Sequence, residues 1–210
     1  TRRSAAQHSQ SLHALVAHIP GLKVAMPSSA YEAKGLMKTA IRDDNPVVIF
    51  EDKLMYQDKA PVPEEEYLIP FGEAAVLREG ADVTLVGTSS MVQVCLKAAE
   101  ALAGEGISAA VIDPRTLVPF DEATIVDSVR KTSRAIVVDE GHRNFGVTGE
   151  IASRIMEKAF YHLDAPVARL GAMDVPVPFS PALEDLTVPT PEAVADTARK
   201  LCRGELLHAA

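Results

Sequence analysis

The sequence is poor in the residues that mark disulfide-bonded, metal-bound and membrane-spanning proteins. It has 210 residues, no tryptophan and two cysteines, and aromatic residues make up 5% of it. Cys95 and Cys202 lack the spacing of a metal site, and two lone cysteines favour a reducing compartment. No run approaches the roughly 18 apolar residues that cross a membrane, and residues 1–4 lack the apolar core of a secretory signal. We therefore expect a soluble, cytoplasmic protein.

Basic residues are too few for binding to polyanions. Lys and Arg number 21 against 29 Asp and Glu, so the formal net charge is -8. An acidic protein is repelled by nucleic acids and anionic membranes. Small molecules and other proteins are the expected partners. The hydrophobic content of 47% is that of a globular chain.

Residues 1–60 show the pattern of one βαβ unit. The expected elements are a helix before Pro20, a strand at 22–26, a helix from Ser29 to about Ile41 and a strand at 47–50. Ser29 and Glu32 form a capping box at the start of the second helix, and the apolar run 47–50 is typical of a strand buried on both faces. One unit has too few strands to bury a sheet, so we expect more of this domain upstream or in another chain.

Residues 72–210 repeat the alternation of strands and helices after a proline-rich linker at 61–71. We expect strands at 83–87, 109–112, 135–139 and 167–170, and helices at 91–103, 121–131, 148–163 and 191–202. Such alternation predicts an α/β fold with a mostly parallel sheet covered by helices on both faces. A flavodoxin-like nucleotide-binding protein is disfavoured because no glycine-rich phosphate loop is present.

The segment Gln7-His8-Ser9-Gln10 is the first candidate for chemistry. It places an imidazole among hydrogen-bonding side chains at an expected helix start, where the helix dipole disfavours the imidazolium form. His8 can act there as a neutral hydrogen-bond partner or a proton carrier, and the alternative is an ordinary polar helix start. His13 and His18 follow without an acidic third ligand, so we expect no zinc site.

A second candidate is the turn that carries Ala40, Ile41, Asp43 and Asn45. Pro46 forces Asn45 out of the helical region, and carbonyls freed at a helix end can converge on a hard cation such as potassium, calcium or magnesium. The alternative is an Asx turn that satisfies its own hydrogen bonds.

Two acidic segments follow predicted strands of the second domain. Asp113-Pro114-Arg115-Thr116 and Asp139-Glu140-Gly141-His142 should both lie at one edge of the sheet. We expect a structural ion pair between Arg115 and Asp139 or Glu140. Cys95, in an apolar helix, is expected to be buried.

Several segments, in their order and spacing, resemble a known family. They are Ala5-Ala6-Gln7-His8-Ser9-Gln10, His18-Ile19-Pro20-Gly21-Leu22-Lys23-Val24, Asp43-Asp44-Asn45-Pro46-Val47-Val48, Asp113-Pro114-Arg115-Thr116-Leu117-Val118-Pro119 and Asp164-Ala165-Pro166-Val167. As a set they resemble the beta subunit of the thiamine-diphosphate-dependent component of pyruvate, acetoin and branched-chain 2-oxo acid dehydrogenase complexes. Pro114 departs from the apolar residue usual in that family.

The resemblance implies a transketolase-like architecture, with the end of a pyrimidine-binding domain at residues 1–60 and a transketolase C-terminal domain at 72–210. It implies that thiamine diphosphate with magnesium lies between alpha and beta subunits, and that a glutamate upstream of this chain contacts the aminopyrimidine. It assigns His8 to proton transfer or to guiding the lipoyl group, and Ala40, Ile41, Asp43 and Asn45 to a potassium ion held mainly by backbone oxygens.

The function implied is decarboxylation of a 2-oxo acid or cleavage of acetoin, with acyl transfer to lipoyl-lysine. The implied partners are an alpha subunit, a second beta subunit and the lipoyl-bearing acyltransferase core. The isolated chain is expected to be inactive, and the alternative is a noncatalytic assembly module. The apolar, proline-punctuated stretch 175–183, which cannot form a helix, is expected to bury Phe179 against a partner; packing against its own domain is the alternative.

Overall fold

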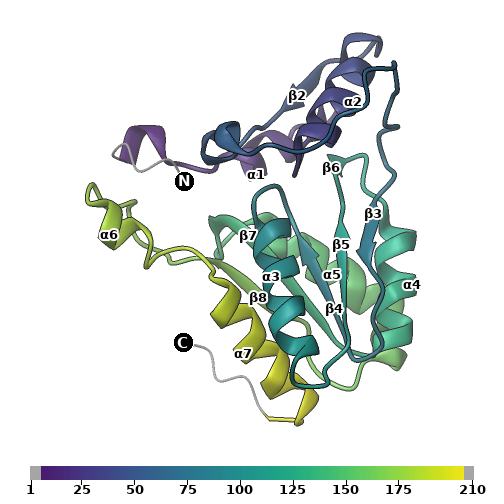
Figure 1. Ribbon diagram of the computed structural model, residues 1–210, viewed down its shortest axis with the longest axis vertical. Coiled ribbons are helices and arrows are strands. Elements are labelled where there is room, and N and C mark those ends of the chain that lie inside the picture. Colours follow the sequence, from purple (N-terminus) through teal and green to yellow (C-terminus); the bar gives the residue numbers. More distant parts are fainter. Residues whose placement is uncertain (1–5, 206–210) are drawn as a thin grey trace.

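The computed structural model describes residues 6–205. Figure 1 shows a smaller N-terminal part stacked on a larger part that contains the main sheet and the last helix. The strands form a three-stranded sheet in the order β2-β1-β6 and a five-stranded sheet in the order β3-β5-β4-β7-β8. Within residues 6–205, no helix is both long and apolar enough to cross a membrane.

The N-terminal part contains the predicted βαβ unit. Its elements are η1 (Ala6–His8), α1 (His13–Ala17), β1 (Lys23–Ala25), α2 (Ala30–Ile41), β2 (Val47–Ile49) and η2 (Lys53–Gln57). The N-cap half of the capping-box prediction is confirmed, because the Ser29 hydroxyl accepts a hydrogen bond from the Glu32 backbone N–H. The Glu32 carboxylate accepts from the backbone N–H of Ser28 rather than from that of Ser29. β2 is only half-buried, so the prediction of burial on both faces was wrong: this strand lies at the edge of its sheet.

The predicted first helix is shorter than expected. A 3-10 turn covers Ala6–His8, and the α-helix begins only at His13. His8 therefore does not lie at the start of an α-helix, so the predicted influence of a helix dipole on its imidazole is absent.

The larger part confirms the mostly parallel sheet. It consists of β3 (Ala75–Arg78), β4 (Val83–Gly87), β5 (Ala109–Asp113), β7 (Ala135–His142) and β8 (Ala168–Ala172). β4, β5, β7 and β8 pair in parallel, and only β3 is antiparallel to its neighbour. β3 was not predicted.

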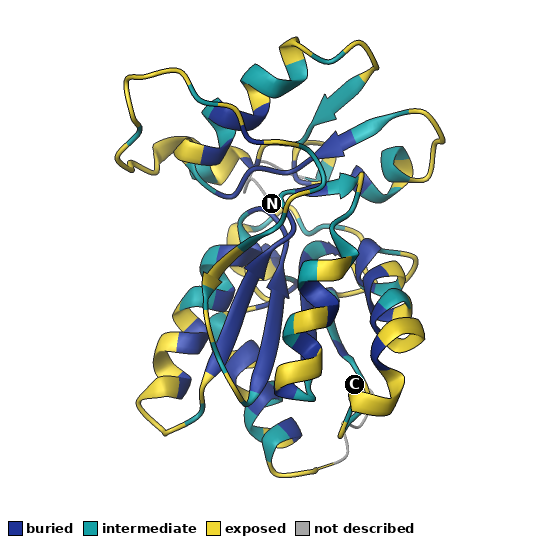
Figure 2. Cartoon of the chain, turned by 90° about the vertical axis from the view of Figure 1, so that its right-hand side faces the viewer, coloured by how far each residue is buried: buried dark blue, intermediate teal, exposed yellow. Residues whose placement is uncertain are grey.

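Helices cover both faces of this sheet because alternate strand residues point to opposite sides. Leu85, Val111 and Ile136 pack with residues of α3 (Met91–Ala103) and α7 (Pro191–Cys202). Val86 and Ile112 pack with residues of α4 (Glu122–Thr132) and α5 (Val147–Ala159). The central strands β4 and β5 are buried along their length and β7 along most of it, as the dark blue arrows of Figure 2 show, whereas the edge strands β3 and β8 are partly exposed. Cys95 is fully buried on α3, as predicted.

Two further elements were missed. β6 (Thr116–Val118) leaves the larger part and pairs antiparallel with β1, so both parts contribute to the smaller sheet. α6 (Pro181–Glu184) contradicts the prediction that 175–183 cannot form a helix, since proline is compatible with the first helical turn. A 3-10 turn, η3 (Phe160–His162), extends α5.

Candidate active-site face between the two parts

Polar side chains gather where the C-terminal ends of β5 and β7 meet the N-terminal part. Both strands run parallel to β4, so Asp113 and Asp139 lie at the same edge of the sheet, as predicted. Each carboxylate contacts a residue of the N-terminal part: Asp113 contacts Ser28, and Asp139 contacts His13. The edge therefore holds two separate polar clusters.

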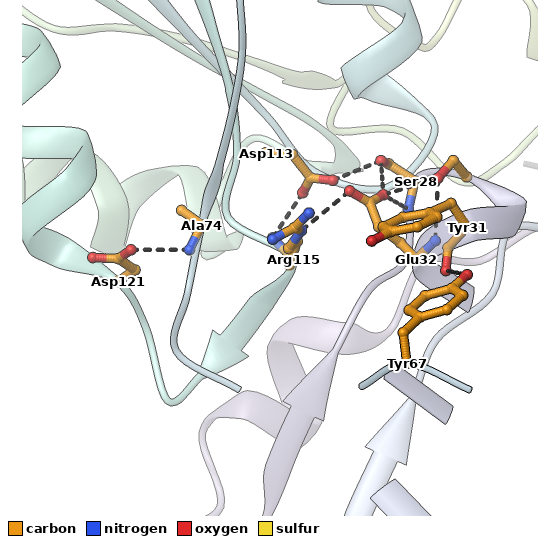
Figure 3. A network of polar contacts seen from close by, with 9 residues as sticks. Ser28, Tyr31, Glu32, Tyr67, Ala74, Asp113, Arg115 and Asp121 are labelled. Atoms are coloured by element: carbon orange, nitrogen blue, oxygen red, sulfur yellow. Dashed lines mark hydrogen bonds and ion pairs between the residues drawn. The ribbon is translucent and has the colours of Figure 1, made fainter. Parts of the chain in front are cut away.

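The first cluster joins Ser28 and Glu32 to Asp113 and Arg115 (Figure 3). The Ser28 hydroxyl lies 2.6 Å from Asp113 Oδ2 and also contacts Glu32 Oε2. Arg115 Nε donates to Glu32 Oε1 at 3.1 Å, and its backbone N–H donates to Asp113 Oδ1 at 2.7 Å. Ser28, Glu32 and Asp113 are buried.

This arrangement requires a proton on one of the two carboxyl groups. A serine hydroxyl donates one hydrogen only, so it donates to one carboxylate and accepts from the other carboxyl when both contacts are hydrogen bonds. Burial, followed by the charge of Glu32, raises the pKa of Asp113 to about 8. The shift favours the protonated form of Asp113 near neutral pH.

The predicted pairing of Arg115 with Asp139 or Glu140 was wrong. β4 lies between β5 and β7 in the sheet, so the ends of β5 and β7 are not neighbours. Arg115 instead forms an ion pair with Glu32 across the boundary between the two parts.

The second cluster centres on His13 and Asp139. His13 Nε2 lies 2.9 Å from Asp139 Oδ2, and neither side chain is more than 2% exposed. Asp139 also accepts hydrogen bonds from the Thr88 hydroxyl and, at 3.0 Å, from the Gly141 N–H. Burial lowers the pKa of His13, but the hydrogen bond and charge of Asp139 outweigh it and raise that pKa above its ordinary value. Although burial of Asp139 favours its neutral form, the hydrogen bond and charge of His13 lower its pKa, so the contact favours the charged forms of both side chains.

His8 lies close to this cluster and is exposed. It lines a polar cavity of about 130 Å³ together with Ser9, Ser11, Asp52 and Glu140. The Ser9 hydroxyl is buried and has no hydrogen-bond partner among the described residues. Burial, and then the charge of Asp52, raises the pKa of Glu140.

The predicted cation turn follows the end of α2. The Asp43 carboxylate accepts hydrogen bonds from the Asn45 backbone N–H at 2.9 Å and from its side-chain amide at 2.8 Å. It also pairs with Lys23, and these contacts lower the pKa of Asp43 to about 2. The Asx turn that was the alternative is therefore present. It uses the Asp43 carboxylate and the N–H groups of Asn45, so the backbone oxygens of Ala40, Ile41, Asp43 and Asn45 stay the predicted ligands of a cation.

A larger hollow of about 570 Å³ lies elsewhere, between α1, β6 and the start of α5. Its lining is mostly apolar, with Leu15, Val118 and Phe145 among its residues. It contains none of the residues predicted for chemistry. We place the candidate site at the polar cavity beside His8.

Sequence reasoning missed the roles of Ser28, Glu32 and Thr88. Glu32 was recognised as a capping residue, yet its carboxylate also accepts from the Ser28 backbone N–H at 3.2 Å and binds Arg115. Two adjacent serines before a helix that carries a buried glutamate are a weak signal for such a cluster. The partners across the boundary lie more than 80 residues away.

Family models match both parts of the chain. The model of the transketolase C-terminal domain matches residues 72–194. This chain belongs to the transketolase family. The model of the transketolase pyrimidine-binding domain matches residues 2–59. These matches confirm the predicted resemblance and the predicted fold class.

Curated relatives of this transketolase-family chain include two kinds of subunit. The acetoin:2,6-dichlorophenolindophenol oxidoreductase subunit beta of Bacillus subtilis is 48% identical over 199 residues, which are 95% of this chain and 58% of the relative. The pyruvate dehydrogenase E1 component subunit beta of Rickettsia felis is 48% identical over 200 residues, 95% of this chain and 61% of the relative. The chain thus spans about three fifths of their length.

A solved structure has the same fold. It is a split-gene transketolase, described as an inactive beta4 tetramer, with a TM-score of 0.73 and 27% identity. The match covers 94% of this chain and 63% of that one.

Proposed function

We propose that this chain is the C-terminal portion of the beta subunit of a thiamine-diphosphate-dependent 2-oxo acid or acetoin dehydrogenase. The observation that carries the proposal is 48% identity, over 95% of the chain, to beta subunits named for pyruvate and for acetoin. Its reaction is decarboxylation of a pyruvate-like 2-oxo acid or cleavage of acetoin, followed by acyl transfer to lipoyl-lysine of the acyltransferase core.

The described residues suit one wall of a thiamine diphosphate site. The exposed His8 imidazole lies beside the buried, unpartnered hydroxyl of Ser9, at a polar cavity open to a further group. The resemblance assigns the diphosphate and its magnesium to the alpha subunit. In residues 6–205 no three His, Cys, Asp or Glu side chains are grouped so as to hold a metal ion.

Within such an enzyme the cofactor supplies the carbanion chemistry. This chain would supply His8, which moves a proton or guides the lipoyl group at the mouth of the site. Its exposure suits both roles, because a proton carrier must reach a group outside its own chain. Ala40, Ile41, Asp43 and Asn45 are proposed to hold a structural potassium ion mainly through backbone oxygens.

The proposed partners are an alpha subunit, a second beta subunit and the lipoyl-bearing acyltransferase core. Phe179 is 81% exposed and Leu186 is 72% exposed. The alternative that Phe179 packs against its own domain is therefore wrong, and a partner surface around residues 175–186 is supported. The cytoplasmic location stays a prediction.

Reconstitution tests the proposal against a noncatalytic assembly module. The chain is assayed alone, and again when joined to the N-terminal beta-subunit residues of the Bacillus subtilis relative and co-purified with a matching alpha subunit. We expect thiamine-diphosphate-dependent reduction of an artificial acceptor by pyruvate or acetoin in the assembly only. An assembly that forms but stays inactive would support the noncatalytic module, and activity of the chain alone would refute the inference that it is a partial subunit.

A further inference from the structure

The segment that carries His8 is attached to the C-terminal domain by two consecutive residues of β7. Asp139 contacts His13, and Glu140 Oε1 accepts a hydrogen bond from the Ser11 hydroxyl at 2.8 Å. Ser11 and His13 follow closely after the 3-10 turn that ends at His8. Both attachments cross from one part of the molecule to the other.

The attachment at His13 is closely fitted. The imidazole packs edge-on against Phe50, with ring centroids 6.0 Å apart. Gly141 allows the approach: a Cβ at this position would lie 2.6 Å from Asp139 Oδ2 and 3.2 Å from His13 Cε1. Any larger residue at position 141 must therefore displace the His13–Asp139 pair.

The attachment at Ser11 adjoins the candidate site. Ser11, Glu140 and His8 line the same polar cavity of about 130 Å³. Only two residues separate His8 from Ser11, so a change in the position of Ser11 is transmitted through a short stretch of backbone. Glu140 can therefore affect the placement of His8.

We propose that Asp139 and Glu140 are positioning residues for His8, which hold residues 8–13 against the end of β7 and so fix the imidazole at the active-site face. This inference rests on the proposed function, because it assumes that His8 works in catalysis. It adds that the C-terminal domain, and not the pyrimidine-binding part alone, determines where that histidine lies.

The test measures turnover in the complete alpha/beta assembly, for Glu140→Gln and Gly141→Ala alone and combined with His8→Ala. Glu140→Gln removes the charge that receives the Ser11 hydrogen bond, and Gly141→Ala displaces the Asp139 pair without deleting either partner. A misplacement of about 1 Å can cost up to a hundredfold in rate. We expect a fall of about tenfold or more in acyl transfer, with KM for the 2-oxo acid changed less than about twofold.

The combined variants separate positioning from general damage. Residues that act only through His8 lose their effect once His8 is absent, so Glu140→Gln in the His8→Ala background should change turnover less than about twofold. An equal loss in both backgrounds, or no loss in either, overturns the inference. If His8→Ala alone keeps wild-type turnover, the proposed function of His8 is refuted, and the inference with it.

Hydrogen exchange of the assembly gives a readout that does not depend on catalysis. Amides of residues 9–19, among which those of Ser9, Leu15 and His18 donate backbone hydrogen bonds, should exchange faster in Glu140→Gln and Gly141→Ala, while the strands of the main sheet keep their protection. Glu157→Gln is the matched control, because Glu157 accepts a hydrogen bond from Ser153 at 3.4 Å on the exposed face of α5. Unchanged exchange at 9–19 in both test variants overturns the inference.

Discussion

The buried carboxyl of Asp113 makes a prediction that depends on pH. Its pKa is raised to about 8 in the folded chain, whereas the ordinary value for an aspartate is 3.8. The folded chain therefore retains a proton that the unfolded chain loses as pH rises between these values. The stabilisation is complete below about pH 4 and is lost as pH increases toward 8. Each pH unit is worth about 1.4 kcal/mol per proton, so the loss between pH 5 and pH 8 is at most about 4 kcal/mol.

Asp113→Asn removes this dependence and keeps the hydrogen bonds. The amide oxygen accepts from the Arg115 N–H, and the amide nitrogen donates to the Ser28 hydroxyl, which is then free to donate to Glu32. The variant should match the wild type near pH 5 and be the more stable protein at pH 8. Denaturant unfolding at constant ionic strength and four pH values measures the difference.

A control of opposite sign is available at Asp121. This residue caps α4, and although its partial burial favours the protonated form, hydrogen bonds from Thr124 and Ala74 lower its pKa. The stabilisation from Asp121 is present above its ordinary pKa and is lost as pH falls. Asp121→Asn should therefore lower the free energy of unfolding most at neutral pH. If the free energies of unfolding of the wild type and of Asp113→Asn changed with pH in parallel, Asp113 would not be protonated in the folded chain.

Four other variants test separate parts of the account. Arg115→Met leaves Glu32 buried without its cation and should lower the free energy of unfolding by about 3 kcal/mol, measured by denaturation; a change under about 1 kcal/mol contradicts the pairing. His8→Ala in the assembly should keep the melting temperature and reduce lipoyl acylation by about a hundredfold. Asn45→Ala should lower the melting temperature. It should also abolish the higher melting temperature that the wild type shows in potassium than in sodium, and a difference that persists counts against the site. Phe179→Asp should keep the fold and lose the beta-to-beta contact in a mass measurement, and retained assembly excludes this surface.

Local sequence signals predicted much of the fold. Ser29 and Asp121 are N-caps, and Pro191 lies in the first turn of α7, because each effect depends on neighbouring residues only. The apolar strands, which alternate with helices along the chain, also predicted a sheet covered by helices on both faces.

Long-range pairing was not predictable in the same way. β6 has three residues and leaves its own domain to pair with β1, and no local pattern indicates such a partner. The partner of Arg115 depends on β4 lying between β5 and β7, which is a property of strand order and not of composition. The polar segment around His8 made it a candidate, and the family resemblance assigned its role, whereas its attachment through Ser11 and His13 became visible only in three dimensions.

The most direct test of the central claim is turnover of the reconstituted assembly with His8 present and with His8→Ala. Acyl transfer to lipoyl-lysine is measured with pyruvate and with acetoin, in the presence and absence of thiamine diphosphate. We predict turnover that requires the cofactor, the alpha subunit and His8. A correctly assembled complex that shows no turnover with either substrate, or full turnover without His8, would contradict the assignment of this chain to the active-site face.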